Sequence, residues 1–184
     1  MNIIFTRPLI DSEDLMMNFF SSKHKVIHMP TLSIASANME PINTKDYDGL
    51  IFTSANAVRF LKLKNDDKNT KCFCVGNLTE RSLRLKGFNN TVAASGTVNA
   101  LKNIIINSEK NIKNLAYLCG DVVSHELDKE LTQEGFKVSK VINYTSTKIT
   151  DLNKENMDLI KKYPANITLI YSRRSAESFD EIIR

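Results

Sequence analysis

The sequence predicts an α/β protein made of two α/β sandwich domains with mostly parallel sheets, joined by a two-strand linker. Three observations lead to this prediction. Short apolar runs alternate with helical segments along the chain, two extended polar stretches interrupt that alternation, and one strand-to-helix turn occurs twice. Alternating strands and helices are typical of a parallel sheet with helices on both faces.

The apolar runs have the length of buried strands, and between most of them the apolar residues recur at helical spacing. Because the runs are apolar throughout, both faces of each strand are expected to be covered. We predict strands over 2–6, 25–29, 49–53, 71–75, 114–119, 137–144 and 166–171. We predict helices over 8–20, 56–63, 78–85, 97–106 and 123–133.

Two stretches, 29–41 and 143–151, stay extended and polar and show no helical period. We interpret them as two linker strands, by which the chain leaves one domain and later returns to it. The first domain would then be discontinuous, with residues 1–31 and 147–184, and the second would hold 32–146. A single continuous sheet is the alternative, and we prefer two domains because both stretches are polar and non-helical.

The repeated turn supports the same division. The sequence LIFTSANAVRFL begins at Leu50, and LIYSRRSAESFD begins at Leu169. Ala57 and Phe60 of the first copy match Ala176 and Phe179 of the second copy. The division places one copy in each domain.

Composition limits the classes of function. A hydrophobic content of 42% suits a globular protein, and a formal net charge of +4 allows an anionic ligand but is too diffuse to indicate nucleic acid binding. The N-terminus has no signal-peptide pattern, and no apolar segment approaches the length of a membrane span. The three cysteines indicate reduced thiols in a cytoplasmic protein, and Cys72 and Cys74 fit a buried strand face better than a metal site.

In open α/β sheets, ligands bind beyond the carboxyl ends of the strands. Several predicted strands end in hydroxyl residues or glycine where a helix begins, which offers free backbone N–H groups to an anion. Each such residue taken singly is better explained as a helix cap. The turns are 6–8, 53–56, 76–79, 120–121, 144–146 and 172–175.

Familiar catalytic motifs are missing from the sequence. It contains no G-x-S-x-G nucleophile elbow, no G-x-x-x-x-G-K-[ST] phosphate loop and no G-x-G-x-x-G after the first strand. His24, His28 and His125 are better explained as structural or solvated residues, and no paired carboxylates suggest acid–base work. A receiver-like or flavodoxin-like domain is disfavoured, because no acidic pair follows the first strand.

Taken in order along the chain, the motifs resemble the uroporphyrinogen-III synthase family. FTSANAV and the VG-x-x-T…GF pattern are the most specific parts of the resemblance. The motifs are Thr6-Arg7-Pro8, DGLIFTSANAV (48–58), VGNLTERSLRLKGF (75–88), LCGD (118–121), LTQEGFKVSKVINYTST (131–147) and LIYSRRSAESF (169–179).

The resemblance implies two α/β domains joined by a two-strand ladder, with no cofactor and no metal. It implies a lyase of haem biosynthesis. Its substrate would be hydroxymethylbilane, a linear tetrapyrrole with eight carboxylates, and its product uroporphyrinogen III, formed by cyclisation with inversion of the last ring and loss of water. We expect a cytoplasmic monomer that binds this small molecule and neither nucleic acid nor membrane.

The resemblance also implies roles for single residues. Tyr144 would assist loss of the substrate hydroxyl, as a proton or hydrogen-bond donor, and capping a linker strand is its alternative role. The guanidinium of Arg7 would pair with a carboxylate. The residues implied in substrate binding are Thr6, Arg7, Thr53, Ser54, Asn56, Thr79 and Ser172.

The sequence departs from the family pattern at two places. Arg173 stands where the family usually has proline after the serine of the second repeat. The second repeat is not followed by the units that follow the first, so we expect the C-terminal part of the family pattern to be missing after Arg184.

A non-catalytic function stays open as an alternative. The chain could be a two-lobed α/β module that binds a tetrapyrrole or another polycarboxylate without converting it. Tyr144→Phe together with binding data separates the two hypotheses, because a module that only binds should lose little of its affinity for the tetrapyrrole.

Overall fold

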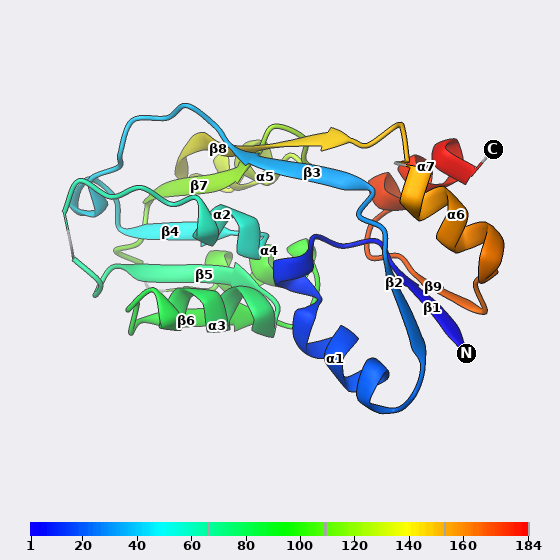
Figure 1. The fold of residues 1–184 in the computed structure, drawn as a ribbon. Helices are drawn as coiled ribbons and strands as arrows, with labels where there is room; N and C mark the ends of the chain where they lie inside the picture. The colour runs from blue at the N-terminus through cyan, green and yellow to red at the C-terminus, as the bar shows by residue number, and fades with distance from the viewer. Residues whose placement is uncertain (66, 109, 153, 184) are drawn as a thin grey trace. The chain divides into compact units, whose positions relative to one another are not determined.

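A computed structural model of the chain describes residues 1–65, 67–108, 110–152 and 154–183. It confirms the prediction of an α/β fold with mostly parallel sheets (Figure 1). By the density of internal contacts the chain divides into unit 1, Met1–Ile34 with Ser146–Arg184, and unit 2, Ala35–Thr145. The domain limits expected from the sequence, 1–31 with 147–184 and 32–146, stay a prediction.

Unit 1 contains a three-stranded sheet in the order β2-β1-β9, in which β1 pairs in parallel with both neighbours. Its core is small: Ile4, Ile27 and Met29 are buried, and apolar residues of the C-terminal segment pack against them. The elements of unit 1 are β1 (Asn2–Phe5), a 3-10 turn (Leu9–Asp11), α1 (Glu13–Ser21), β2 (Lys25–His28), α6 (Lys154–Lys162), β9 (Ile167–Leu169) and α7 (Arg173–Ile183).

Unit 2 is built on the six-stranded sheet β3-β8-β7-β4-β5-β6, in which the pairs of β4, β5, β6, β7 and β8 are parallel. Strands β3 and β8 run past the limits of unit 2. The elements are β3 (Leu32–Ser36), a 3-10 turn (Thr44–Asp46), β4 (Gly49–Phe52), α2 (Ala55–Arg59), β5 (Lys71–Val75), α3 (Asn77–Leu85), β6 (Thr91–Ala94), α4 (Val98–Ile106), β7 (Asn114–Gly120), α5 (Leu127–Gln133) and β8 (Lys137–Lys148).

Each face of the unit 2 sheet is covered by its own helices, as the alternation of side chains along a strand requires. On one face, Leu50 and Phe52 of β4 pack with residues of α2 and α3. On the other face, Ile51 packs with Leu101 of α4 and Leu131 of α5. Both faces of the unit 2 sheet are therefore packed, and the turns that follow its strands lie beyond the ends of this packed layer.

The structure adds two elements that the sequence did not lead us to expect. Residues Thr91–Ala94 form β6 at the sheet edge, and Lys154–Lys162 form α6. It also shortens several predictions: the helices expected over 56–63 and 123–133 are α2 and α5, and the strand expected over 166–171 is β9. The helix expected over 8–20 is a 3-10 turn followed by α1, and the extended stretch 29–41 contains only the five-residue strand β3.

Candidate functional site

The candidate site lies at the carboxyl edge of the unit 2 sheet, where three neighbouring strands end. Strand β4 leads into Thr53 and Ser54, and β7 ends at Gly120. On the next strand, Tyr144 is the register partner of Gly120. Strands β4, β7 and β8 are adjacent and parallel (Figure 1). These residues from distant parts of the sequence therefore meet at one edge of the sheet.

The ring of Tyr144 lies directly against the backbone of Gly120. A Cβ atom added at Gly120 would lie 2.7 Å from two ring atoms and 3.0 Å from the phenol oxygen. On another side, the ring stacks with Phe60, with 6.4 Å between ring centroids and an interplanar angle of 28°. Glycine at position 120 is therefore the residue that leaves room for the tyrosine.

The phenol of Tyr144 lies near the side chain of Ser54 and the backbone N–H of Gly120, and both act to lower its pKa. Burial raises the pKa of Tyr144 above its ordinary value, and the neighbouring Cys119 and Asp121 raise it further, whereas the two hydrogen bonds lower it. The net direction is upward, so the group keeps its proton at neutral pH. The half-buried phenol can therefore act as a hydrogen-bond donor.

The turn after β4 is fixed by its own hydrogen bonds. Ser54 is the N-cap of α2, and its Oγ accepts a hydrogen bond from the backbone N–H of Asn56 at 3.2 Å. Asn56 Oδ1 accepts a hydrogen bond from Arg59 Nη1 at 2.5 Å. Helix α2 has only five residues. The turn can therefore contribute to ligand binding mainly through side chains in fixed positions, because so short a helix has only a small dipole.

Tyr117 supports this turn from within the sheet. It is 2% exposed, and its hydroxyl lies 3.1 Å from the Oγ1 atom of Thr53. Burial raises the pKa of its phenol, while the hydrogen bond with Thr53 opposes that rise. Sequence patterns carry no functional signal for Tyr117 or for the contact of Gly120 with Tyr144, because both arise from pairing between distant strands.

Thr79 lies in a second turn, at the start of α3. Gly76 precedes this helix with φ 77°, a backbone conformation that favours glycine. The side chain of Thr79 is buried at 4% exposure. Thr79 is therefore part of the packing under the turn, and its hydroxyl does not face solvent.

Unit 1 holds the other three residues implied by the resemblance. Thr6 is 1% exposed, and its Oγ1 donates a hydrogen bond to the carbonyl of Leu169 at 2.8 Å. The guanidinium carbon of Arg7 lies 4.2 Å from the ring centroid of Tyr171. Ser172 caps α7, because its Oγ accepts a hydrogen bond from the backbone N–H of Ser175 at 3.1 Å.

The predicted site residues thus fall into two groups. Thr53, Ser54 and Tyr144 lie together in unit 2, and Asn56 and Thr79 lie in the neighbouring turns of the same unit. The residues of unit 1 are Thr6, Arg7 and Ser172. Of these, Arg7 is the one with a partly exposed cationic group, since the Thr6 hydroxyl is buried and Ser172 serves as a cap.

Within the described ranges, no group of three or more His, Cys, Asp or Glu residues is arranged to hold a metal ion. Cys72, Cys74 and Cys119 are buried free thiols. Burial raises the pKa of Cys74 and Cys119 to about 11, so these thiols are poor nucleophiles at neutral pH. The same described residues contain no helix with the length and apolar composition of a membrane span.

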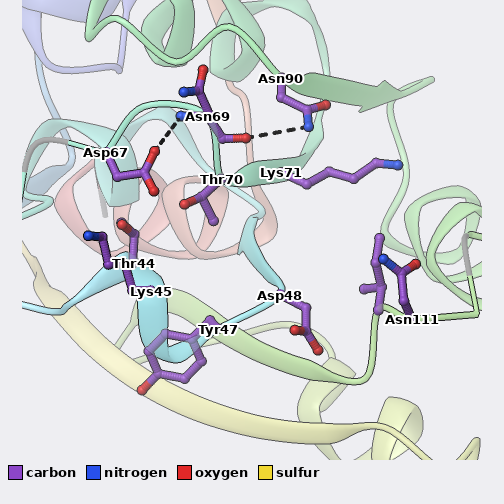
Figure 2. A pocket seen from close by; sticks show the side chains of 11 residues that line it. Thr44, Lys45, Tyr47, Asp48, Asp67, Asn69, Thr70, Lys71, Asn90 and Asn111 are labelled. Carbon is purple, nitrogen blue, oxygen red and sulfur yellow. Dashed lines mark hydrogen bonds between the residues drawn. The ribbon is translucent and has the colours of Figure 1, made fainter.

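A polar pocket of about 330 Å³ lies at the opposite, amino-terminal edge of the unit 2 sheet (Figure 2). Asp48 and Lys71, which line it, stand at the starts of β4 and β5. The pocket mixes carboxylates with lysines, which does not favour a polyanion. None of the site residues implied by the resemblance lines it.

Comparison with known proteins shows the family. The family model described as uroporphyrinogen-III synthase HemD matches residues 19–184. A structure of uroporphyrinogen-III synthetase from Helicobacter pylori superposes with a TM-score of 0.64 at 19% identity, covering 97% of this chain and 76% of that one. A mutant uroporphyrinogen III synthase from Thermus thermophilus gives 0.60 at 13% identity, covering 98% and 77%. No match was found among the curated proteins.

Proposed function

The chain belongs to the uroporphyrinogen-III synthase family, and we propose that it converts hydroxymethylbilane to uroporphyrinogen III in haem biosynthesis. The family match over residues 19–184 is the observation that carries this proposal. The reaction is that of a lyase: the substrate loses water, the last pyrrole ring is inverted, and the macrocycle closes.

We assign the first step to the edge of the unit 2 sheet that carries Tyr144. Its phenol is protonated at neutral pH and is held beside Ser54, so it can donate a hydrogen bond to the departing hydroxyl of the substrate. Because burial raises its pKa, complete proton transfer is less favourable than hydrogen bonding. Departure of the hydrogen-bonded hydroxyl leaves an azafulvene-like cation, and the proton released at ring closure completes the water that is lost.

Orientation then decides which product forms. Attack at the substituted carbon of the last ring gives a spiro intermediate, which fragments, recloses and releases a proton. Attack at the unsubstituted carbon gives the type I isomer. Because no strong acid or base distinguishes the two routes, the protein acts mainly by fixing the geometry of the folded chain.

The eight carboxylates of the substrate need cationic and N–H partners. Arg7 offers a guanidinium fork, and Thr53, Ser54, Asn56 and Ser172 offer turns at strand ends. Thr6 and Thr79 are buried, so we assign them to holding the backbone of their turns rather than to hydroxyl contacts. The formal net charge of +4 is compatible with a polyanionic ligand.

We further propose that the protein works without a cofactor or metal, as a cytoplasmic monomer. The buried free thiols suit a reducing compartment. The chemistry itself needs no redox or Lewis-acid partner, because only a hydroxide and a proton leave the substrate, and together they make one water.

The test is an isomer assay. Hydroxymethylbilane is generated in situ and offered to the protein, and the products are oxidised and separated into type I and type III uroporphyrins. We expect an excess of type III over a control without protein, in which spontaneous closure gives type I. Type I alone from a folded sample that binds the tetrapyrrole would favour the non-catalytic binding module instead.

A further inference from the structure

Strand β8 contains an extra residue opposite the end of β7. Cys119 pairs with Ile142, but the next residue, Gly120, pairs with Tyr144. Asn143 is therefore skipped in the pairing with β7, which defines a β-bulge on that side of the strand. Bulges bend a strand and change the direction in which the following side chains point.

The direction of Tyr144 follows from this bulge. In a regular strand, residues an odd number apart face opposite sides of the sheet. Val141 and Tyr144 are three apart, yet both pack against the same core cluster, the one that α2 and α3 cover. If the same residues ran as a regular strand without a bulge, Tyr144 would face away from α2 and from Ser54.

Two features fix the bulge in place. Asn143 is fully buried, and its Nδ2 donates a hydrogen bond of 2.6 Å to the carbonyl of Ala57 in α2. Gly120 accommodates the ring of Tyr144, since any Cβ there would collide with it. The bulge is thus tied to the helix that begins after Ser54 and is fitted to the tyrosine.

The amide oxygen of Asn143 makes an unfavourable contribution to the stability of the fold. It is buried, and among the described residues it has no hydrogen-bond partner. A buried acceptor without a partner is unfavourable. Such a residue is more readily explained by its effect on the strand's shape than by its contribution to stability.

We propose that Asn143 and Gly120 are positioning residues that aim the phenol of Tyr144 at the turn of Ser54. Neither needs to touch the substrate: Asn143 anchors the bulge to α2, and Gly120 supplies the space for the ring. The consequence for catalysis rests on the proposed function, whereas the placement of the phenol does not.

The placement is tested by the titration of Tyr144, followed by NMR of ¹³C-labelled tyrosine, with Tyr144→Phe to assign its signal. In the parent protein this phenol should titrate above the ordinary tyrosine pKa of about 10. In Gly120→Ala it should shift toward that ordinary value, because the ring is displaced into water. An unchanged titration in folded Gly120→Ala would overturn the proposal.

Gly49→Ala is the matched control. Gly49 lies at the opposite end of the same sheet, and a Cβ there would meet Leu115 and Phe73 side chains at 3.1 Å. The substitution introduces a milder steric clash far from Tyr144, so the Tyr144 titration should not change. If Gly120→Ala does not fold, Asn143→Ala decides: a shifted Tyr144 titration supports the proposal, and an unshifted one refutes it.

A double-mutant cycle tests the link to catalysis. We expect Gly120→Ala to lower the rate of type III formation about tenfold in the parent and less than about twofold in Tyr144→Phe, because the two act as one unit. Equal losses in both backgrounds would contradict positioning through Tyr144. Should the parent make no type III product at all, the proposed function fails, and the NMR titration still judges the placement of the phenol.

Discussion

Buried hydroxyl groups of unit 1 differ in whether they have a hydrogen-bond partner. Ser175 Oγ lies 2.6 Å from Thr31 Oγ1 and donates to Thr6 Oγ1 at 3.2 Å. Thr6 Oγ1 donates onward to the carbonyl of Leu169. The proton of each hydroxyl is thus directed along one chain, from Thr31 through Ser175 to Thr6. In contrast, the buried hydroxyl of Ser12 has no hydrogen-bond partner among the described residues.

This contrast gives a prediction at the level of single residues. Ser175→Ala should lower the free energy of unfolding by roughly 1–3 kcal/mol, because it leaves the buried Thr31 hydroxyl without its acceptor. Ser12→Ala is the matched control and should change it by less than about 0.5 kcal/mol, since no bond is lost. Urea unfolding followed by circular dichroism measures both. Equal decreases in the free energy of unfolding of the two variants would show that the chain of hydroxyl hydrogen bonds does not stabilise the fold.

Residues of the candidate site could be predicted only in part. The repeated turn pointed to Ser54 from the sequence itself, and Tyr144 came from the family resemblance. The contacts of Tyr144 with Gly120 could not be predicted, because strand pairing brings these residues together. The bulge at Asn143 leaves no mark on the sequence pattern. The sequence pattern gives Tyr117 only as a buried residue of an apolar strand, and its hydrogen bond with Thr53 could not be predicted from it.

At the scale of elements, a single carboxylate joins the starts of two strands. Asp48 precedes β4, and its Oδ2 accepts hydrogen bonds from the backbone N–H groups of Asn114, at 2.7 Å, and Lys113, at 2.9 Å, where β7 begins. These two bonds, with that of Asn114 the stronger influence, hold the pKa of Asp48 below its ordinary value. The link aligns β4 and β7 at the edge opposite the candidate site.

The depressed pKa fixes how this link depends on pH. The stabilisation should be present above the ordinary aspartate pKa of about 3.9 and be lost as the pH falls through the lower folded value. Asp48→Asn should therefore be less stable at pH 7, by less than about 1 kcal/mol because the carboxylate is exposed to water. Urea unfolding at pH 7 and below pH 3 should show this difference shrinking. A difference independent of pH would contradict the account.

Elements with strong apolar patterns were predictable from the sequence, and those with weak patterns were not. The strands of both repeats appear where expected, because continuous apolar runs such as GLIF of β4 and KCFCV of β5 are typical of buried strands. Strand β6 reads only TVAA, and it lies at the sheet edge. Helix α6 reads KENMDLIKK and has no buried residue, so its helical period is hidden among charges.

At the scale of the whole chain, the fold is shared with synthases of very low sequence identity. Identities of 19% and 13% accompany TM-scores of 0.64 and 0.60. Most residues therefore differ between this chain and these two synthases, although the family model matches residues 19–184. A reaction controlled by orientation rather than by a strong acid or base depends on where the strand ends lie, and these are set by the fold.

The central claim is that Tyr144, aimed at Ser54, assists the family reaction. The most direct measurement is the initial rate of type III uroporphyrinogen formation by Tyr144→Phe. Its control is Tyr47→Phe, since Tyr47 packs against the same core cluster but lines the pocket at the other sheet edge. We expect the first variant to lose about 100-fold in rate and the second to keep the parent rate. A Tyr144→Phe protein as fast as Tyr47→Phe would contradict the claim.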